Sequence, residues 1–143
     1  MQTIWKSFEQ LTTTELYAVL SLRQAVFMLE QRSLYKDIDG TDLQAQHLLC
    51  YQNSTLIGCL RLLPKADGIT VGRVVVAKPL RGQGVGLNLL NTALEWITAY
   101  PVCLSAQVDS QEFYARLGFE VTSQPYDDAG VLHVDMYKKA KHS

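Results

Sequence analysis

The sequence lacks a membrane-length apolar run and lacks an excess of either charge. Its apolar stretches fall short of the roughly 20 residues that cross a bilayer. The 13 Lys and Arg residues are balanced by 14 Asp and Glu residues, so the formal net charge is −1. A chain without a basic excess is not expected to carry a broad nucleic-acid-binding surface. We therefore expect neither a membrane-spanning segment nor a nucleic-acid partner.

A signal peptide and a cysteine framework are also missing. The first residues, MQTIWKSFEQ, alternate apolar and polar side chains and show no basic segment followed by an apolar one. The three cysteines, Cys50, Cys59 and Cys103, are odd in number and form no C-x-x-C pair, which argues against a disulfide frame or a zinc site. We expect a cytoplasmic protein with reduced thiols and no metal. His142, near the end of the chain, is expected to be inert.

The composition is that of a globular domain. With 143 residues, of which 48% are apolar, the chain can bury a core and is expected to form a single domain over residues 1–143. Thr12 and Glu15 have the spacing of a capping box at the start of a helix. In chain order we expect a strand (2–8), a helix within 12–31, a polar loop (33–46), three strands (47–52, 55–64, 69–77), a helix (85–99), a strand (102–107), a short helix (109–117) and two strands (119–123, 131–138). This order predicts a mixed α/β (α+β) sheet.

A glycine-rich turn follows the valines of the third of these adjoining strands, in the segment RVVVAKPLRGQGVGLNLL (73–90). Gly82, Gly84 and Gly86 allow the backbone to approach an anion, the helix that follows offers unpaired amides, and Arg81 adds a positive charge. The segment lacks the G-K-[ST] of a Walker loop and the G-x-G-x-x-G of a dinucleotide fold. The alternative is a turn that only opens a helix, but the combination favours phosphate binding.

Two motifs resemble those of the GNAT superfamily of N-acyltransferases. The R-x-x-G-x-G of Arg81–Gly86 resembles the family's acetyl-CoA pyrophosphate loop, and FYARLGF (113–119) resembles its later helix. The segments LRQAVFMLEQ, YKDIDGTDLQAQHLL and GVLHV resemble the narrower ElaA-like branch. The resemblance implies the acyl-CoA N-acyltransferase fold, with a splayed central strand pair, and acetyl-CoA as co-substrate.

The resemblance also assigns cofactor contacts by position. The backbone of Val74, Val75 and Val76 would pair with the pantetheine arm, and the amide of Val76 would bind the thioester carbonyl and stabilise the developing oxyanion. Gln107 stands where many relatives carry an asparagine that contacts the cofactor. The pyrophosphate would lie on the amides of six consecutive residues, Arg81, Gly82, Gln83, Gly84, Val85 and Gly86.

Acyl transfer to an amine needs a proton donor for the leaving thiolate and an acceptor for the amine proton. Tyr114 matches the tyrosine that protonates CoA in many members of the family, and a phenol has a suitable reference pKa of about 10. The alternative for Tyr114 is packing against the sheet. Glu30 is the first candidate base, because it shares a predicted helical stripe with Leu16 and Phe27, where a free charge is unexpected. A structural pairing of Glu30 with Arg23 on that stripe is an equal alternative.

By family analogy, the acceptor pocket is formed by the first helix, the loop after it and the last strands. His47 and His133 fall in those segments and are candidate pocket residues, and the alternative for each is a packed or surface histidine. Asp39, with Asp37 and Asp42, is a candidate to attract a cationic amine, and an ordinary solvated loop is the competing interpretation.

Two functions of different class are consistent with the sequence. The first is an acetyl-CoA-dependent N-acetyltransferase that acts on a primary amine of a small molecule or peptide, by direct attack in a ternary complex. The second is a non-catalytic module of the same fold that binds or senses CoA. Tyr114 and a candidate base favour the enzyme. Exposed strand edges also lead us to expect a homodimer, and the sequence does not identify the acceptor amine.

Overall fold

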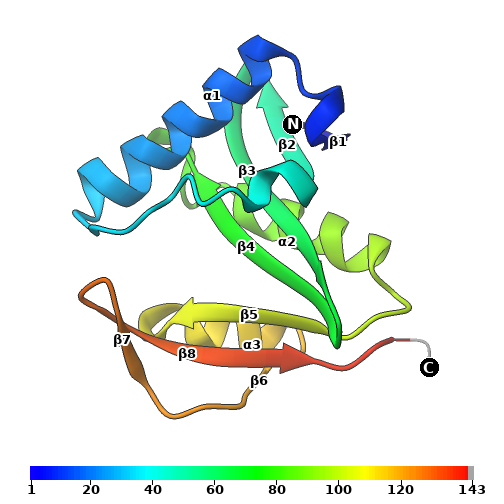
Figure 1. Ribbon diagram of the computed structural model, residues 1–143, viewed down its shortest axis with the longest axis vertical. Helices are drawn as coiled ribbons and strands as arrows, with labels where there is room; N and C mark the ends of the chain where they lie inside the picture. Colours follow the sequence, from blue (N-terminus) through cyan, green and yellow to red (C-terminus); the bar gives the residue numbers. More distant parts are fainter. Residues whose placement is uncertain (142–143) are drawn as a thin grey trace.

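Eight strands form one mixed sheet in the computed structural model, which describes residues 1–141 (Figure 1). His142 lies outside the described residues. The strand order is β1-β2-β3-β4-β5-β8-β6, with β7 also paired to β8, and the β4–β5 pair is parallel. The strands are β1 (Gln2–Ser7), β2 (Gln46–Gln52), β3 (Thr55–Lys65), β4 (Gly68–Val76), β5 (Val102–Gln107), β6 (Glu120–Val121), β7 (Tyr126–Asp128) and β8 (Val131–Lys138).

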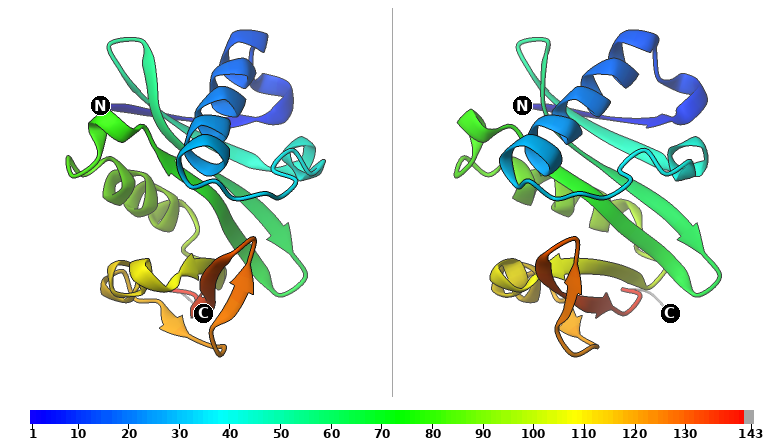
Figure 2. Two further views of the ribbon diagram at one scale, coloured as in Figure 1. Left: turned by 90° about the vertical axis from the view of Figure 1, so that its left-hand side faces the viewer. Right: turned by 60° about the vertical axis from the view of Figure 1, so that its left-hand side comes forward.

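The described part of the chain also contains three α-helices, which cover both faces of the sheet. They are α1 (Thr13–Arg23), α2 (Val85–Trp96) and α3 (Gln111–Arg116). A π-helical segment (Gln24–Glu30) continues α1, and 3-10 turns cover Phe8–Gln10, Thr41–Gln44, Lys78–Leu80 and Val108–Ser110. Figure 2 shows α1 on one face of the sheet and α2 on the other. In the part of the chain that the structure describes, no helix is long and apolar enough to cross a membrane.

The predicted mixed α/β architecture is confirmed, and the main differences lie at element ends. The predicted capping box is present, since Thr12 Oγ1 accepts from the Glu15 amide at 3.0 Å and the Thr12 amide donates to Glu15 Oε1 at 2.9 Å. α2 ends at Trp96 rather than near residue 99. The stretch 124–130, expected to be a turn, contains β7, because the turn itself needs only Ala129 and Gly130, both with positive φ.

The core has two parts because neighbouring strand residues face opposite sides of the sheet. Leu48 and Leu60 pack with buried residues of α2, whereas Leu49 and Cys59 pack with Val19 of α1. The residues of β5 alternate between buried and accessible positions, and Cys103 is half-buried.

A glycine lets α2 approach the sheet closely. A Cβ atom at Gly58 of β3 would lie 2.9 Å from Val85 Cγ1 and 3.1 Å from Leu89 Cδ1. These distances are too short for a side chain, so α2 sits against bare backbone at this point. The contact fixes the first turn of α2, and with it the glycine-rich turn, relative to the central strands.

The two central strands separate soon after they meet. β4 and β5 pair only at Ile69 with Val102 and at Thr70 with Cys103. From Val71 to Val76 the β5-facing edge of β4 has no strand partner, so the predicted splayed pair is confirmed. Figure 1 shows the two strands diverging from the end of the β3–β4 hairpin.

The first helix continues from residue 24 as a π-helix. The helical stripe predicted from Leu16 to Glu30 therefore does not stay on one face of the helix. The Gln31 amide donates to the Val26 carbonyl at 3.0 Å, which is the five-residue spacing of a π turn. Since each π turn takes up more residues than an α turn, Glu30 no longer lies on the face that buries Val19 and Arg23. The expectation that Glu30 belongs to the buried stripe is therefore wrong, and its side chain is partly accessible to solvent.

A cluster of three arginines and three aspartates, Arg23, Arg61, Arg73, Asp37, Asp39 and Asp42, ties the loop after the π segment to the sheet. We call it the Arg–Asp cluster. The guanidinium of Arg23 lies 2.9 Å from both Asp37 Oδ2 and Asp42 Oδ1. Arg61 on β3 lies 2.9 Å from Asp39 Oδ2 and 3.0 Å from Asp42 Oδ1. Arg73 on β4 places its Nε 2.7 Å from Asp37 Oδ1.

The cluster also lowers the pKa of two of its carboxyl groups, those of Asp39 and Asp42. Hydrogen bonds from Arg61 hold the pKa of Asp39 well below its usual range. Burial raises the pKa of Asp42, but the hydrogen bonds and charges of Arg23 and Arg61 outweigh it, so the pKa of Asp42 is lowered. The acids predicted to attract an amine are thus already neutralised by arginines.

Replacing Asp42 should destabilise the protein strongly. Asp42→Asn removes the carboxylate that the guanidinium groups of Arg23, which is 1% exposed, and Arg61, which is 5% exposed, share, so we expect a loss of about 3 kcal/mol in urea unfolding. The exposed Asp67→Asn is the control and should stay within about 0.5 kcal/mol of wild type. Because the folded state lowers the pKa of Asp42, its contribution is complete above the unfolded carboxyl pKa of about 4 and is lost as the pH falls further. Equal stability of the Asp42→Asn and wild-type proteins would refute this role.

Candidate active site

A cleft of about 490 Å³ lies between the diverging strands β4 and β5. Its volume is in the range of small-molecule sites, which is about 300–1,000 Å³. Four parts of the chain line it, namely the π segment with the loop after it, the centre of β3 and β4, the end of β5 with α3, and the β7–β8 hairpin. The lining residues that matter below are Phe27, Gln31, Tyr35, Arg61, Arg73, Val74, Gln107, Tyr114, Asp128 and His133.

The open edge of β4 is shaped by a bulge. The register with β3 shifts between Cys59 and Arg61, and Arg73 has a φ of 50°. A non-glycine residue with positive φ is held there by its surroundings, and Arg73 is fixed by its contact with Asp37 and by the Tyr35 ring, 5.1 Å from its guanidinium carbon. This bulge turns the unpaired backbone of β4 toward the cleft.

The three valines of β4 occupy different environments. Val74 lines the cleft. Val75 is buried against α1, as expected for a core side chain. Val76 is half-buried and packs on the α2 side, where its Cγ2 would lie 3.6 Å from a Cβ at Gly86. Side-chain packing at Val75 and Val76 thus coexists with an open backbone edge on β4.

The glycine-rich turn presents a row of free amides. Gly82 and Gly84 have φ angles of 77° and 81°, and a Cβ at either would meet nothing within 4 Å. Within residues 1–141, the amides of Gly82, Gln83 and Gly84 donate to no backbone carbonyl. The next three amides, from Val85 on, form the first turn of α2 and have no intrahelical acceptor. The turn can therefore hold an anion on amides 82–87, aided by the positive end of the helix.

Arg81 was expected to offer its backbone amide to the pyrophosphate, but its amide and its side chain both have other partners. Its amide donates to the Lys78 carbonyl at 3.3 Å, so this amide is not free for pyrophosphate. Its side chain bridges two elements, since Nε donates to the Val76 carbonyl at 3.2 Å and Nη2 to Glu30 Oε1 at 2.9 Å. The guanidinium links the end of the π segment to the end of β4.

Glu30 is not placed to act as the base. Its carboxylate pairs with Arg81, and this hydrogen bond lowers the pKa of Glu30. It is also absent from the lining of the cleft. The alternative partner, Arg23, binds Asp37 and Asp42 instead. Glu30 therefore stands beside the anion-binding turn as a negative charge.

Tyr114 lies in the wall of the cleft. It projects from α3 into the lining of the cleft and contacts Phe113 and Phe119 edge-on, with ring centroids 5.2 Å and 6.0 Å away. Burial raises the pKa of Tyr114, which keeps the phenol protonated at neutral pH. The ring packs against the core while the residue borders the cleft, so the packing interpretation is confirmed and the proton-donor role stays a prediction.

Gln107 also borders the cleft, at the last position of β5. Its side-chain Nε2 lies 3.4 Å from Gln31 Oε1, across the cleft on the loop after the π segment. The side-chain amide of Gln107 therefore links the two walls of the cleft. Gln31 was not identified from the sequence, because a polar residue in a polar loop carries no pattern of its own.

The two candidate histidines differ in position. His133 lines the cleft. His47 is 2% exposed, lies outside the lining, and its Nε2 is 3.0 Å from the Asp42 carbonyl oxygen. Burial lowers the pKa of His47, so it is a neutral structural residue beside the Arg–Asp cluster. Asp39 likewise binds Arg61 and Arg73 rather than lining the cleft.

Several residues in or beside the cleft wall were not predicted from the sequence. Tyr35, Arg73 and Asp128 line it, and Tyr126 bonds to Ser105 beside it. No local sequence pattern marks these residues. They come together only in the folded chain, from a loop, a bulge and a hairpin that are far apart in sequence. No group of three or more His, Cys, Asp or Glu side chains in residues 1–141 is arranged to hold a metal ion.

Comparison with known proteins gives a consistent result from sequence and structure. A family described as an acetyltransferase (GNAT) domain matches residues 10–140. Protein ElaA of Escherichia coli K12 is 38% identical over 139 residues, which cover 91% of this chain and 91% of that protein. The crystal structure of Escherichia coli ElaA aligns with a TM-score of 0.93 and 35% identity, over 97% of this chain and 100% of that chain. An acyl-CoA N-acyltransferase from Pseudomonas aeruginosa aligns with a TM-score of 0.90 and 36% identity, over 96% and 98% of the two chains.

Removing the charge of Glu30 should strengthen anion binding at the turn. Glu30→Gln frees the guanidinium of Arg81 and removes a negative charge beside amides 82–87. We expect the Kd for CoA, measured by titration calorimetry, to fall by up to about fivefold. Glu95→Gln, the same charge change in the last turn of α2, should leave the Kd unchanged. Weaker CoA binding by Glu30→Gln would show instead that the ion pair supports the site.

Proposed function

The chain belongs to the GNAT acetyltransferase family, and we propose that it transfers an acetyl group from acetyl-CoA to a primary amine of a small molecule or peptide. One observation carries the proposal. The cleft between β4 and β5 has an unpaired strand edge along one side, Tyr114 in its wall, and a row of free amides at the nearby start of α2. The relative from Pseudomonas aeruginosa, described as an acyl-CoA N-acyltransferase, supports acyl-CoA as the donor.

In this proposal each part of the donor meets a chemically matched part of the chain. The diphosphate lies on the amides of residues 82–87, which offer hydrogen bonds and the helix dipole. The pantetheine arm pairs with the free edge of β4 as an added strand, in the way extended ligands join an open sheet. The thioester then lies deep in the cleft, within reach of Tyr114.

The proposed reaction proceeds in one ternary complex. The neutral amine nitrogen attacks the thioester carbon, a bond from nitrogen to carbon forms, and the carbon–sulfur bond breaks. A β4 amide, that of Val76 or Val74, donates to the carbonyl oxygen as negative charge develops on it. The Tyr114 hydroxyl donates its proton to the departing thiolate, and the amine loses one proton to a base.

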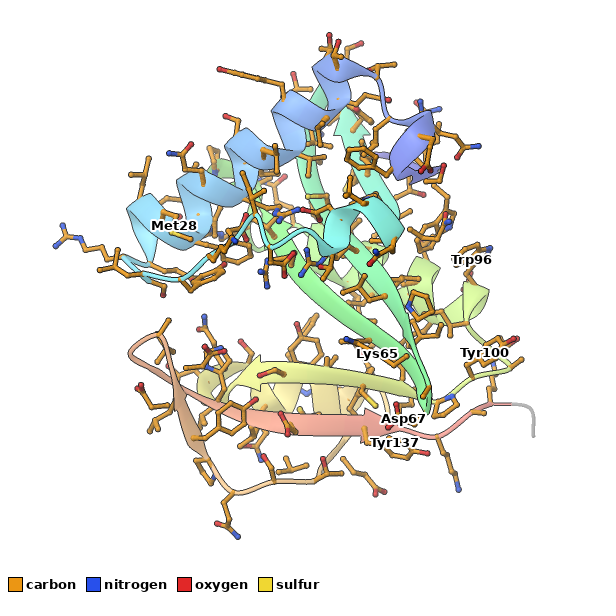
Figure 3. The ribbon with its side chains drawn as sticks, in the orientation of Figure 1. Met28, Lys65, Asp67, Trp96, Tyr100 and Tyr137 are labelled. Atoms are coloured by element: carbon orange, nitrogen blue, oxygen red, sulfur yellow. The ribbon has the colours of Figure 1, made fainter. Side chains whose placement is uncertain are left out.

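Replacing Tyr114 should separate chemistry from binding. Tyr114→Phe keeps the ring but removes the proton donor, so thiol release from acetyl-CoA with a panel of primary amines should fall by about 100-fold or more. The Kd for CoA should stay within about twofold. Tyr100→Phe is the matched control, because Tyr100 is exposed and lies away from the cleft (Figure 3). An unchanged rate would remove Tyr114 from the reaction, and tight CoA binding without thiol release in wild type would favour a CoA-binding module.

Placing a charge on the turn should abolish donor binding. Gly84→Asp forces a side chain onto a residue with a φ of 81° and sets a carboxylate among the amides that would hold the diphosphate. We expect CoA binding to vanish in titration calorimetry. Gly130→Asp is a matched control, since Gly130 has a φ of 86° and equally open space but lies in the β7–β8 turn. Unchanged CoA affinity in Gly84→Asp would refute the placement of the diphosphate.

A further inference from the structure

With Glu30 and His47 placed elsewhere, the proposed reaction lacks a group to take the amine proton. The charged or titratable residues that line the cleft in the described chain are Tyr35, Arg61, Arg73, Tyr114, Asp128 and His133. The two arginines bind aspartates of the Arg–Asp cluster. Burial raises the pKa of Tyr35 to about 12 and also raises that of Tyr114, so both phenols are protonated. Asp128 and His133 therefore remain as candidate proton acceptors.

The position of His133 matches that of the reacting end of the cleft. In the sheet, His133 of β8 pairs with Gln107, the last residue of β5, and Tyr114 follows seven residues later along the chain. Tyr137, four residues beyond His133 on β8, pairs with Cys103 at the closed end of the diverging strands. His133 thus stands toward the open end of the cleft, whose lining it shares with Tyr114.

A backbone carbonyl sets the tautomer of the ring. His133 Nδ1 lies 2.8 Å from the Val131 carbonyl oxygen. A carbonyl only accepts hydrogen bonds, so Nδ1 must carry the hydrogen. A neutral imidazole protonated at Nδ1 has its lone pair on Nε2. His133 of β8 therefore carries a basic nitrogen at Nε2 rather than an N–H group.

Contacts from the neighbouring strand β7 hold the orientation of the His133 ring. The Tyr126 ring stacks on His133 with centroids 6.3 Å apart and planes at 27°. Tyr126 is itself fixed, since its hydroxyl donates to Asp135 Oδ1 at 2.6 Å and accepts from Ser105 Oγ at 2.5 Å. Such outer contacts fix a catalytic imidazole in one orientation.

We propose that His133 is the general base of the reaction, and that its Nε2 takes the proton from the acceptor amine. The inference rests on the proposed acyl transfer. The ammonium of the acceptor gives one proton to Nε2, and the neutral amine attacks the thioester. Tyr114 protonates the departing thiolate, and the attacking nitrogen gives its second proton to the Tyr114 phenolate, which restores the phenol. The imidazolium keeps its hydrogen bond to Val131 and later releases the proton to solvent. Asp128, on the same β7–β8 hairpin, also lines the cleft and adds a negative charge that favours a cationic acceptor.

The tautomer can be tested without knowing the acceptor. Long-range ¹H–¹⁵N correlation spectra of the full chain labelled with ¹⁵N-histidine report which ring nitrogen carries the hydrogen, and the His133 signals are assigned from their absence in His133→Asn. We expect the neutral ring of His133 to be protonated at Nδ1. Protonation at Nε2 would overturn the proposal, because that ring has no lone pair to offer to the cleft.

The base role is tested by kinetics with named acceptors. His133→Asn keeps an N–H donor near the position of Nδ1 but removes the basic nitrogen, so kcat with 1,4-diaminobutane, L-lysine or 2-phenylethylamine should fall by about 100-fold or more. In His133→Asn the remaining rate should keep rising with pH toward the pKa of the acceptor amine, because only amine that is already neutral can then react. Hydroxylamine is uncharged near neutral pH and needs no base, so its rate should fall much less.

The controls separate this inference from the proposed function. Leu132→Asn, an adjacent exposed residue on the opposite face of β8, should keep the wild-type rate, and all variants should keep the wild-type Kd for CoA. Equal loss of rate with amines and hydroxylamine would assign His133 a structural role and overturn the proposal. A wild-type chain that binds CoA but acetylates neither the amines nor hydroxylamine contradicts the proposed function itself.

Discussion

Two residue pairs between β4 and β5 determine the shape of the site. Ile69 with Val102 and Thr70 with Cys103 join the two halves of the sheet, and beyond them the strands part. The parting leaves one edge of β4 without hydrogen-bond partners, which a folded chain rarely tolerates unless a ligand or water takes their place. The cleft and its free strand edge both follow from this single departure from regular pairing.

The walls of the cleft are held apart by interactions of different kinds. On one side, the Arg–Asp cluster ties a loop without regular structure to β3 and β4 through buried ion pairs. On the other, the β5–β8 strands and α3 carry Gln107, Tyr114 and His133 on a regular scaffold. Catalytic groups on rigid strands and helices are positioned more accurately than groups on loops. The wall formed by the loop is therefore suited to shaping the pocket for the acceptor, and the wall formed by β5, β8 and α3 is suited to the proposed proton transfer.

Local patterns predicted the parts of the fold that depend on neighbouring residues. The capping box at Thr12 and the turn at Gly82 and Gly84 are properties of a few consecutive residues, so the sequence contains their full cause. Glu30 was misplaced because the change from α to π winding at residue 24 is imposed by packing rather than by propensity. The pairing of Arg23 with Asp37 and Asp42, and the exclusion of His47 from the cleft, depend on contacts across the fold that no periodicity encodes.

The central claim is that the free edge of β4 and the amides of residues 82–87 receive the donor. Amide hydrogen exchange of the protein with and without CoA tests it most directly, residue by residue. The account predicts slower exchange on CoA addition at unpaired β4 amides between Val74 and Val76 and at residues 82–87, with β1 and β2 unchanged. CoA binding that leaves those amides unprotected, or protects only other parts of the chain, would contradict the account.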